Sequence, residues 1–131
     1  MTPLLAHVVF AMGVGRILIG LAPFVAAGTA SRMLRFPSAH DSPTTRLMAR
    51  LFGVRDIGLG VLVFYALAHP EAAMFLFLFN ACMDAGDLFS TGIPLVGRHG
   101  IDRAAVASSL FALTGGLGWI CVWTVARAHQ G

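Results

Sequence analysis

Hydrophobic residues fall into four long runs separated by short polar segments. The runs cover about residues 4–27, 51–68, 72–91 and 104–126. Each has roughly 18 to 24 residues, and about 20 apolar residues in a helix cross the hydrocarbon core of a bilayer. Turn-forming residues lie between the runs, in segments 36–45, 69–71 and 92–102. The pattern predicts an all-α fold, an integral membrane four-helix bundle that forms a single domain over residues 1–131.

The amino-acid composition is that of a membrane protein and argues against nucleic acid as a partner. Hydrophobic residues make up 57% of the chain and charged residues 11%, whereas soluble domains average about 25% charged residues. No run of basic residues suggests nucleic-acid binding, so we expect the lipid bilayer as a partner and no nucleic acid. The N-terminus has no basic segment before its apolar run, and Arg16 interrupts that run. We therefore expect a retained helix there and not a signal peptide.

The placement of arginine predicts how the bundle is oriented. The first and third polar segments and their flanks hold six arginines, the second segment holds none, and the C-terminal tail holds one. Basic residues favour the cytoplasmic side. We expect both termini on the non-cytoplasmic side of a bacterial inner membrane or an equivalent membrane. The arginines in this comparison are Arg32, Arg35, Arg46, Arg50, Arg98 and Arg103 against Arg127.

The third run carries two carboxylates well inside its apolar stretch. Asn80, Asp84, Asp87 and Thr91 are spaced four, three and four residues apart, which places them on one face of a helix. An ionisable group within the membrane costs a few kcal/mol or more unless it has a partner or a water-filled cavity. These aspartates therefore predict polar partners on the other helices.

Partners of the right charge lie at matching depths. Arg55 and Asp56 lie in the second run, Ser109 in the fourth, and Arg16 deeper in the first. We expect Arg16 or Arg55 to pair with one of the third-run aspartates. Two arginines face three carboxylates, so one carboxylate lacks a full partner, and we expect Asp84 or Asp87 to be the working acid or base.

Several functions are compatible with this charged layer. The first is an enzyme that acts on a lipophilic small molecule by acid/base chemistry, of hydrolase or isomerase type. Its residue types are similar to those of limonene-epoxide-type hydrolases, by analogy alone. The alternatives are a proton-coupled small-molecule transporter that works as a homo-oligomer, a non-catalytic lipid-binding or accessory subunit, and an inert ion-pair network. The candidate catalytic residues are Asp84, Asp87, Arg55 and Asp56, and the candidate substrate contacts are Arg16, Asn80, Ser109 and Tyr65.

A metal site is disfavoured at the same place. Asp84, Asp87 and Asp56 would offer oxygen ligands for magnesium or calcium, but Arg55 would compete for those oxygens. The five histidines are scattered among the ends and loops, and no CxxC or glycine-rich phosphate loop is present. We expect no metal and no cofactor.

Aromatic residues near the helix ends and glycine-rich segments predict membrane anchoring and close helix packing. Tyr65, Trp119 and Trp123 lie toward the outer ends of their helices, where anchoring at the membrane interface is the main interpretation and ligand stacking the alternative. The segments GVGRILIG (13–20) and GVRDIGLG (53–60) each hold glycines seven residues apart, and GGLG occupies residues 115–118. We interpret all three as sites of close helix packing.

The second run also carries a resemblance. The segment FGVRDIGLG (52–60), the glycine-arginine first helix and the four-helix length resemble small bacterial and fungal membrane proteins of unknown function, loosely similar to the DoxX-like group. The resemblance implies a four-helix bundle and no established substrate. DoxX-like proteins are linked to quinone-associated redox systems, and no redox motif in this chain carries that role over.

Overall fold

Helices form almost all of the protein. The computed structural model describes residues 1–129, and no strand occurs among them. The α-helices are α1 (Pro3–Val25), α2 (Ala27–Met33), α3 (Pro43–Ala68), α4 (Pro70–Gly97) and α5 (Asp102–Ala128), and a short 3₁₀ helix covers Ser38–His40. Four of the helices, α1, α3, α4 and α5, are long and apolar enough to cross a membrane. This confirms the all-α membrane bundle and indicates an integral membrane protein.

Two helices begin where the local sequence provides a cap. The Oγ1 atom of Thr2 accepts a hydrogen bond from the backbone N–H of Leu5, and Pro3 follows Thr2 as the first residue of α1. At α3, Ser42 accepts in the same way from Thr45, again just before a proline. Such caps satisfy backbone donors that a helix leaves free at its start. The cap at Ser42 starts α3 eight residues before the predicted position 51, so segment 43–50 is helix and not loop.

The third connection is also shorter than predicted. Helix α4 continues through Pro94 to Gly97, and Arg98 ends it in the left-handed conformation with a φ of 51°. The predicted turn over 92–102 therefore shrinks to residues 98–101. Asp102 is the first residue of α5 and its side chain makes no cap hydrogen bond, because Ile101 occupies the cap position.

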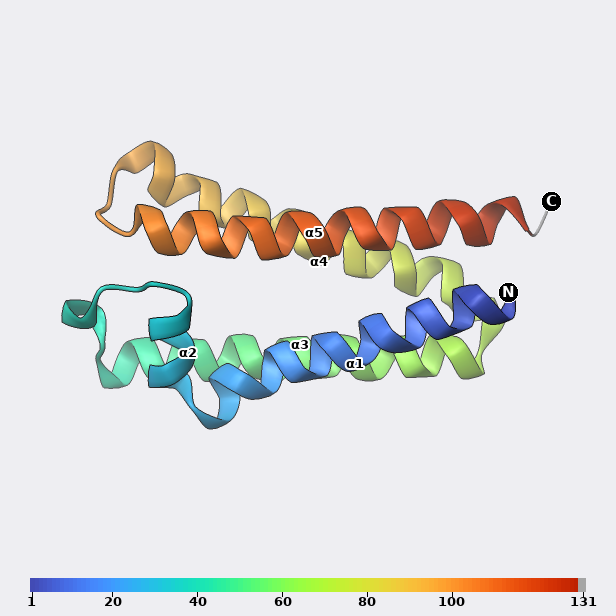
Figure 1. Ribbon diagram of the computed structural model, residues 1–131, viewed down its shortest axis with the longest axis horizontal. Helices are drawn as coiled ribbons and strands as arrows, with labels where there is room; N and C mark the ends of the chain where they lie inside the picture. Colours follow the sequence, from blue (N-terminus) through green and yellow to red (C-terminus); the bar gives the residue numbers. More distant parts are fainter. Residues whose placement is uncertain (130–131) are drawn as a thin grey trace.

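The long helices pack as two antiparallel pairs. Helix α1 packs mainly against α3, and α4 packs mainly against α5, with fewer contacts between the pairs. Figure 1 shows the α1–α3 pair below the α4–α5 pair, with both termini at one end of the molecule. Helix α2, the 3₁₀ helix and the α4–α5 turn lie together at the other end. We call this the arginine-rich end, because Arg32, Arg35, Arg46, Arg98 and Arg103 lie in or beside these segments.

Glycines let α1 and α3 approach closely. A Cβ atom added to Gly20 would lie 2.6 Å from the carbonyl oxygen of Gly53, and one added to Gly53 would meet the carbonyl oxygen of Gly20. About two helical turns further along α3, a Cβ atom added to Gly60 would lie 3.0 Å from the carbonyl oxygen of Gly13. The repeated seven-residue spacing is therefore a packing seam, which we call the glycine seam (Gly13, Gly20, Gly53 and Gly60). The packing interpretation of this pattern is confirmed.

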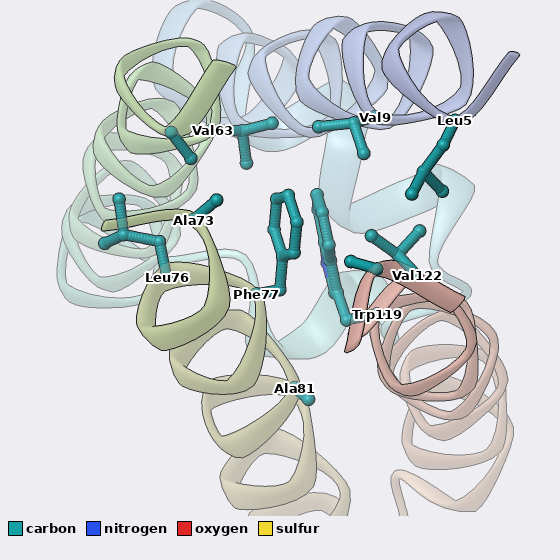
Figure 2. Close-up of a cluster of buried hydrophobic side chains, with 11 residues drawn as sticks. Leu5, Val9, Val63, Ala73, Leu76, Phe77, Ala81, Trp119 and Val122 are labelled. Atoms are coloured by element: carbon teal, nitrogen blue, oxygen red, sulfur yellow. The ribbon is translucent and has the colours of Figure 1, made fainter. Parts of the chain in front are cut away.

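An aromatic pair fills the core on the side of the charged layer that faces the termini. The rings of Phe77 and Trp119 stack with centroids 6.0 Å apart and planes at 19°. Figure 2 shows both rings pointing toward Val9 and Val63, so α4 and α5 meet the α1–α3 pair here. Trp119 is 1% exposed. It was expected at the membrane interface and instead packs in the core, because its position on α5 faces the other helices.

Candidate functional site

A deeply buried ion pair joins α1 to α4. The guanidinium of Arg16 donates two hydrogen bonds to the carboxylate of Asp84, at 2.6 Å and 3.0 Å. Both side chains are buried, at 9% and 7% exposure. This two-point geometry suits a guanidinium and a carboxylate and fixes their relative orientation. The expected pairing of an arginine with an aspartate across helices is confirmed.

Helix α5 makes room for this pair through its glycines. A Cβ atom on Gly115 would lie 2.7 Å from Oδ2 of Asp84, and one on Gly116 would lie 3.4 Å from the Cβ atom of Asp84. Gly118 faces Met12 of α1 in the same way, at 2.9 Å. The GGLG segment therefore lets α5 lie directly against the ion pair, as its interpretation as a close-packing site predicted.

A second ion pair joins α3 to α4 one turn away. Arg55 donates two hydrogen bonds to Asp87, at 2.7 Å and 2.6 Å. This pair is less buried, with side-chain exposures of 32% and 23%. The guanidinium also lies over the ring of Phe52, 4.6 Å from its centroid, a cation–π contact that supports it from the same helix.

The third carboxylate, Asp56, lies between the two pairs. Its Oδ1 atom is 3.3 Å from Nε of Arg16 and 3.9 Å from Nη2 of Arg55. Asp56 is 3% exposed, and no hydrogen bond to its side chain is found within residues 1–129. Both arginines already hold another aspartate by two hydrogen bonds. The carboxylate without a full partner is therefore Asp56 and not Asp84 or Asp87, because each of those two faces an arginine of the other helix pair.

Two further polar residues of the predicted set lie on α4 and α5. Asn80 is fully buried one turn before Asp84 and donates a hydrogen bond to the carbonyl of Leu76. Its Oδ1 atom is buried and has no hydrogen-bond partner among the described residues. Ser109 hydrogen-bonds with Thr91 at 2.7 Å and joins α5 to the far end of α4. Ser109 is thus engaged with another residue of the predicted polar face.

Tyr65 does not join the charged layer. It lies near the end of α3, nine residues after Asp56, which is about 13 Å along a helix. Its ring is exposed and stacks on His69, with centroids 4.1 Å apart. Because α3 is a continuous helix, its length separates Tyr65 from the aspartates. The structure therefore brings together Arg16, Arg55, Asp56, Asp84 and Asp87, which we call the charged layer, with Asn80 beside it.

The layer links the two helix pairs electrostatically. The α1–α3 pair supplies both arginines and Asp56, and the α4–α5 pair supplies Asp84 and Asp87. With every group ionised, the α1–α3 side carries one net positive charge, the α4 side carries two negative charges, and the whole layer carries −1. No cluster of three or more His, Cys, Asp or Glu side chains placed to hold a metal ion occurs in the described part of the chain.

Comparison with known families gives one match. A model described as a domain of unknown function, DUF4267, matches residues 13–127. The chain belongs to this family. The match covers all five residues of the charged layer and the whole glycine seam. No curated protein and no solved structure matches the chain.

The sequence predicted the members of the charged layer, but not which arginine pairs with which aspartate or which carboxylate lacks a full partner. Depth along the spans was enough to predict that Arg16 or Arg55 pairs with a third-run aspartate, but not which arginine meets which aspartate. The lack of a full partner at Asp56 depends on which helices pack side by side, and the run pattern does not contain that information. The role of Gly115 in admitting Asp84 also depends on the packing of α5. The GGLG segment signalled close packing without naming its neighbour.

Proposed function

We propose that the charged layer binds and releases a proton during proton-coupled transport of a small molecule. The observation that carries this proposal is that three carboxylates and two arginines, with a formal charge of −1, join the two helix pairs. The contacts between these pairs are fewer than the contacts within each pair. One proton brings the layer to neutrality. A net charge within a membrane is costly, so a neutral layer is favourable when no other cation is near.

Asp56 is the best candidate for the proton site. Asp84 and Asp87 each hold an arginine through two hydrogen bonds, so protonating either would break a strong pair. Asp56 contacts both arginines more loosely. A change of charge at Asp56 alters the attraction of Arg16 and Arg55 for α4, and through them the position of one helix pair against the other. Four spanning helices are few for a pathway, and a homo-oligomer would supply the rest.

The test compares three spin-labelled proteins across a pH series. Labels on Met48→Cys in α3 and Val106→Cys in α5, in a Cys82→Ala/Cys121→Ala background, report the distance between the pairs by pulsed electron resonance. We expect the distance distribution to change with pH in the otherwise native protein and to stay fixed in Asp56→Asn. The matched control is Asp41→Asn, a carboxylate outside the layer, which should retain the pH response. An unchanged response in Asp56→Asn would refute the proton site.

A second candidate function rests on Asn80. A fully buried side chain with an acceptor oxygen that has no partner is costly unless something donates to it. A water or the hydroxyl of a lipophilic substrate would satisfy this oxygen, with Asp84 one turn away and Asp56 as the acid or base. This supports acid/base chemistry on a lipophilic small molecule.

Mass spectrometry of the purified protein tests this second candidate. A lipophilic hydroxyl compound should co-purify with the native chain and be lost from Asn80→Leu. Asn80→Asp keeps an acceptor oxygen and should retain the compound. If all three proteins carry the same compounds, the enzyme proposal loses its support.

Both candidates need an orientation in the membrane, and the arginine bias supports one. We propose that the arginine-rich end faces the cytoplasm and that both termini lie on the opposite side. A membrane-impermeant thiol reagent should fail to label Ser38→Cys from the outside of intact cells and should label a cysteine placed at the extreme C-terminus. The reverse labelling pattern would overturn the orientation.

The likeness to the DoxX-like group stays a prediction from the sequence and supplies no substrate.

A further inference from the structure

A hollow at the arginine-rich end lies apart from the charged layer. It has a volume of about 220 Å³ and is open to the surface. Arg32 of α2 and Arg46 and Arg50 of α3 line it, together with the backbone segment 25–29 that links α1 to α2. Because the connection between α1 and α2 is a single residue, Ala26, α2 folds back beside α3 and brings Arg32 to the other two arginines.

The hollow carries an excess of positive charge. Asp41 accepts two hydrogen bonds from Arg46, at 2.7 Å and 2.8 Å. Arg32 donates to the hydroxyl of Thr29 at 3.0 Å, and within residues 1–129 neither Arg32 nor Arg50 forms a salt bridge. Three arginines and one carboxylate leave a formal charge of +2. Guanidinium groups arranged in this way favour a phosphate or another oxyanion.

The surroundings of the hollow select the kind of anion. Val25, which lines it, is 73% exposed, and Leu47 and Leu51 on the neighbouring face of α3 are 51% and 56% exposed. Arg50 lies five residues before Arg55 of the charged layer, about 7 to 8 Å along the helix. The arginines thus lie between the polar connection and the apolar body of the bundle, at the level where lipid headgroups meet hydrocarbon. An amphiphile with an anionic head and apolar tails fits both surfaces.

We propose that this hollow binds the phosphate group of an anionic phospholipid whose acyl chains lie along Leu47 and Leu51. Arg32 and Arg50 hold the phosphate oxygens, and Arg46 stays fixed by Asp41 at the rim. The site is independent of the proton site at Asp56. It ties α2 and the start of α3 to one leaflet of the membrane.

Native mass spectrometry of delipidated protein in detergent tests the site with phosphatidylglycerol and phosphatidylcholine as probes. We expect phosphatidylglycerol to bind more tightly. The Arg32→Gln/Arg50→Gln double variant should bind it about tenfold or more weakly, since two basic residues are removed and each contributes roughly fivefold to binding an anionic lipid at the membrane surface. The matched control is Arg98→Gln/Arg103→Gln, which removes the same charge from the same end of the molecule outside the hollow. It should leave binding within about twofold of the native value, well under that tenfold step.

Three outcomes would overturn the proposal. Equal losses in the two double variants would show that overall charge and not the hollow holds the lipid. Equal binding of phosphatidylcholine would remove the anionic preference. Inorganic phosphate or glycerol 3-phosphate that displaces the lipid at similar concentration would identify a site for a free anion, with no part for the acyl chains. Circular dichroism of both double variants confirms that the helices are intact.

Discussion

Arg16 is the residue on which most of the layer converges. It contacts carboxylates of two helices, by two hydrogen bonds to Asp84 and by a looser contact from Nε to Asp56. A buried arginine needs this much compensation because an isolated charge in the membrane is costly. The pair therefore acts as a constraint on how α1 and α4 meet, whatever chemistry the layer performs.

Removing one partner of this pair should be costly. Asp84→Asn leaves Arg16 without its main counter-ion, and breaking a buried pair in this way costs about 3–5 kcal/mol. Asp87→Asn breaks a pair that is partly exposed and should cost clearly less. Unfolding in mixed micelles with increasing denaturing detergent measures both. A loss at Asp87→Asn as large as that at Asp84→Asn would contradict the difference in burial.

One exposed pair gives a pH dependence with a definite sign. The hydrogen bonds from Arg46 hold the pKa of Asp41 below its ordinary value, and the charge of Arg32 lowers this pKa further. A carboxylate whose pKa is lower in the folded protein stabilises the fold above its ordinary pKa of 3.8. That stabilisation is lost as the pH falls through the lowered value. Acid should therefore release the connection that holds Asp41.

A spin label at Ser38→Cys, in a background without the native cysteines, reports this release. We expect the label to gain mobility only below the ordinary pKa of Asp41. Asp41→Asn should show the acid-like mobility at neutral pH already. A rise in label mobility of the native protein at pH values well above that pKa would show that Asp41 does not control the release.

At the scale of the elements, the glycine seam decides how closely α1 and α3 approach. Its backbone contacts leave no space for a methyl group at Gly20 or Gly53. Close backbone approach replaces the hydrophobic effect as the source of helix association within a membrane, where lipid tails are as apolar as side chains. Arg16 lies three residues after Gly13 and four before Gly20, so it shares the face of α1 that carries the seam.

A comparison of Gly53→Ala with Gly58→Ala distinguishes the effect of close packing at the glycine seam from the effect of alanine on helix propensity. A Cβ atom at Gly58 would meet nothing within 4 Å, whereas one at Gly53 would meet the carbonyl of Gly20. Gly58→Ala should be neutral or stabilising by up to about 1 kcal/mol, the usual gain for alanine in a helix. Gly53→Ala should destabilise the protein in the same detergent unfolding experiment. Equal effects of the two changes would argue against the seam.

The elements also show what the sequence could predict. The number and type of the long helices followed from the hydrophobic runs, because a membrane span is a long signal with little competition. Their starts and ends did not. Segment 43–50 reads as polar loop, yet Ser42 and Pro43 start a helix that continues outside the apolar core. In the same way Pro94 lies in a segment that was predicted to be a turn, although the helix tolerates it three residues before its last residue, Gly97.

At the scale of the whole molecule, the two helix pairs are joined by the core around Phe77 and Trp119 and by the charged layer. The covalent link between them is the single residue His69. The sequence predicted that an arginine pairs with an aspartate between helices, but not which residues pair or that they meet across this boundary. The depth of a residue in the membrane can be predicted from its position along a helix. Which of the four helices lie side by side depends on their packing.

A split protein tests whether these contacts alone hold the pairs together. A protease site inserted after His69 lies in a turn, where insertions are tolerated best. After cleavage, the fragments ending and starting there should stay associated in mild detergent. The Asp84→Asn/Asp87→Asn protein, cleaved in the same way, should separate on size-exclusion chromatography. Fragments that separate without any substitution would show that the chain connection is essential.

The position of Asp56 has an electrical consequence. It lies in the interior of a spanning helix, 13 residues after Pro43 and 12 before Ala68. Any proton that reaches it from one side has crossed part of the membrane voltage, and a full crossing is worth about 2.3 kcal/mol per 100 mV. Occupancy at this carboxylate would then follow the membrane potential as well as the pH. A cell that energises its membrane would change the charge of the layer without any change in the acidity of either compartment.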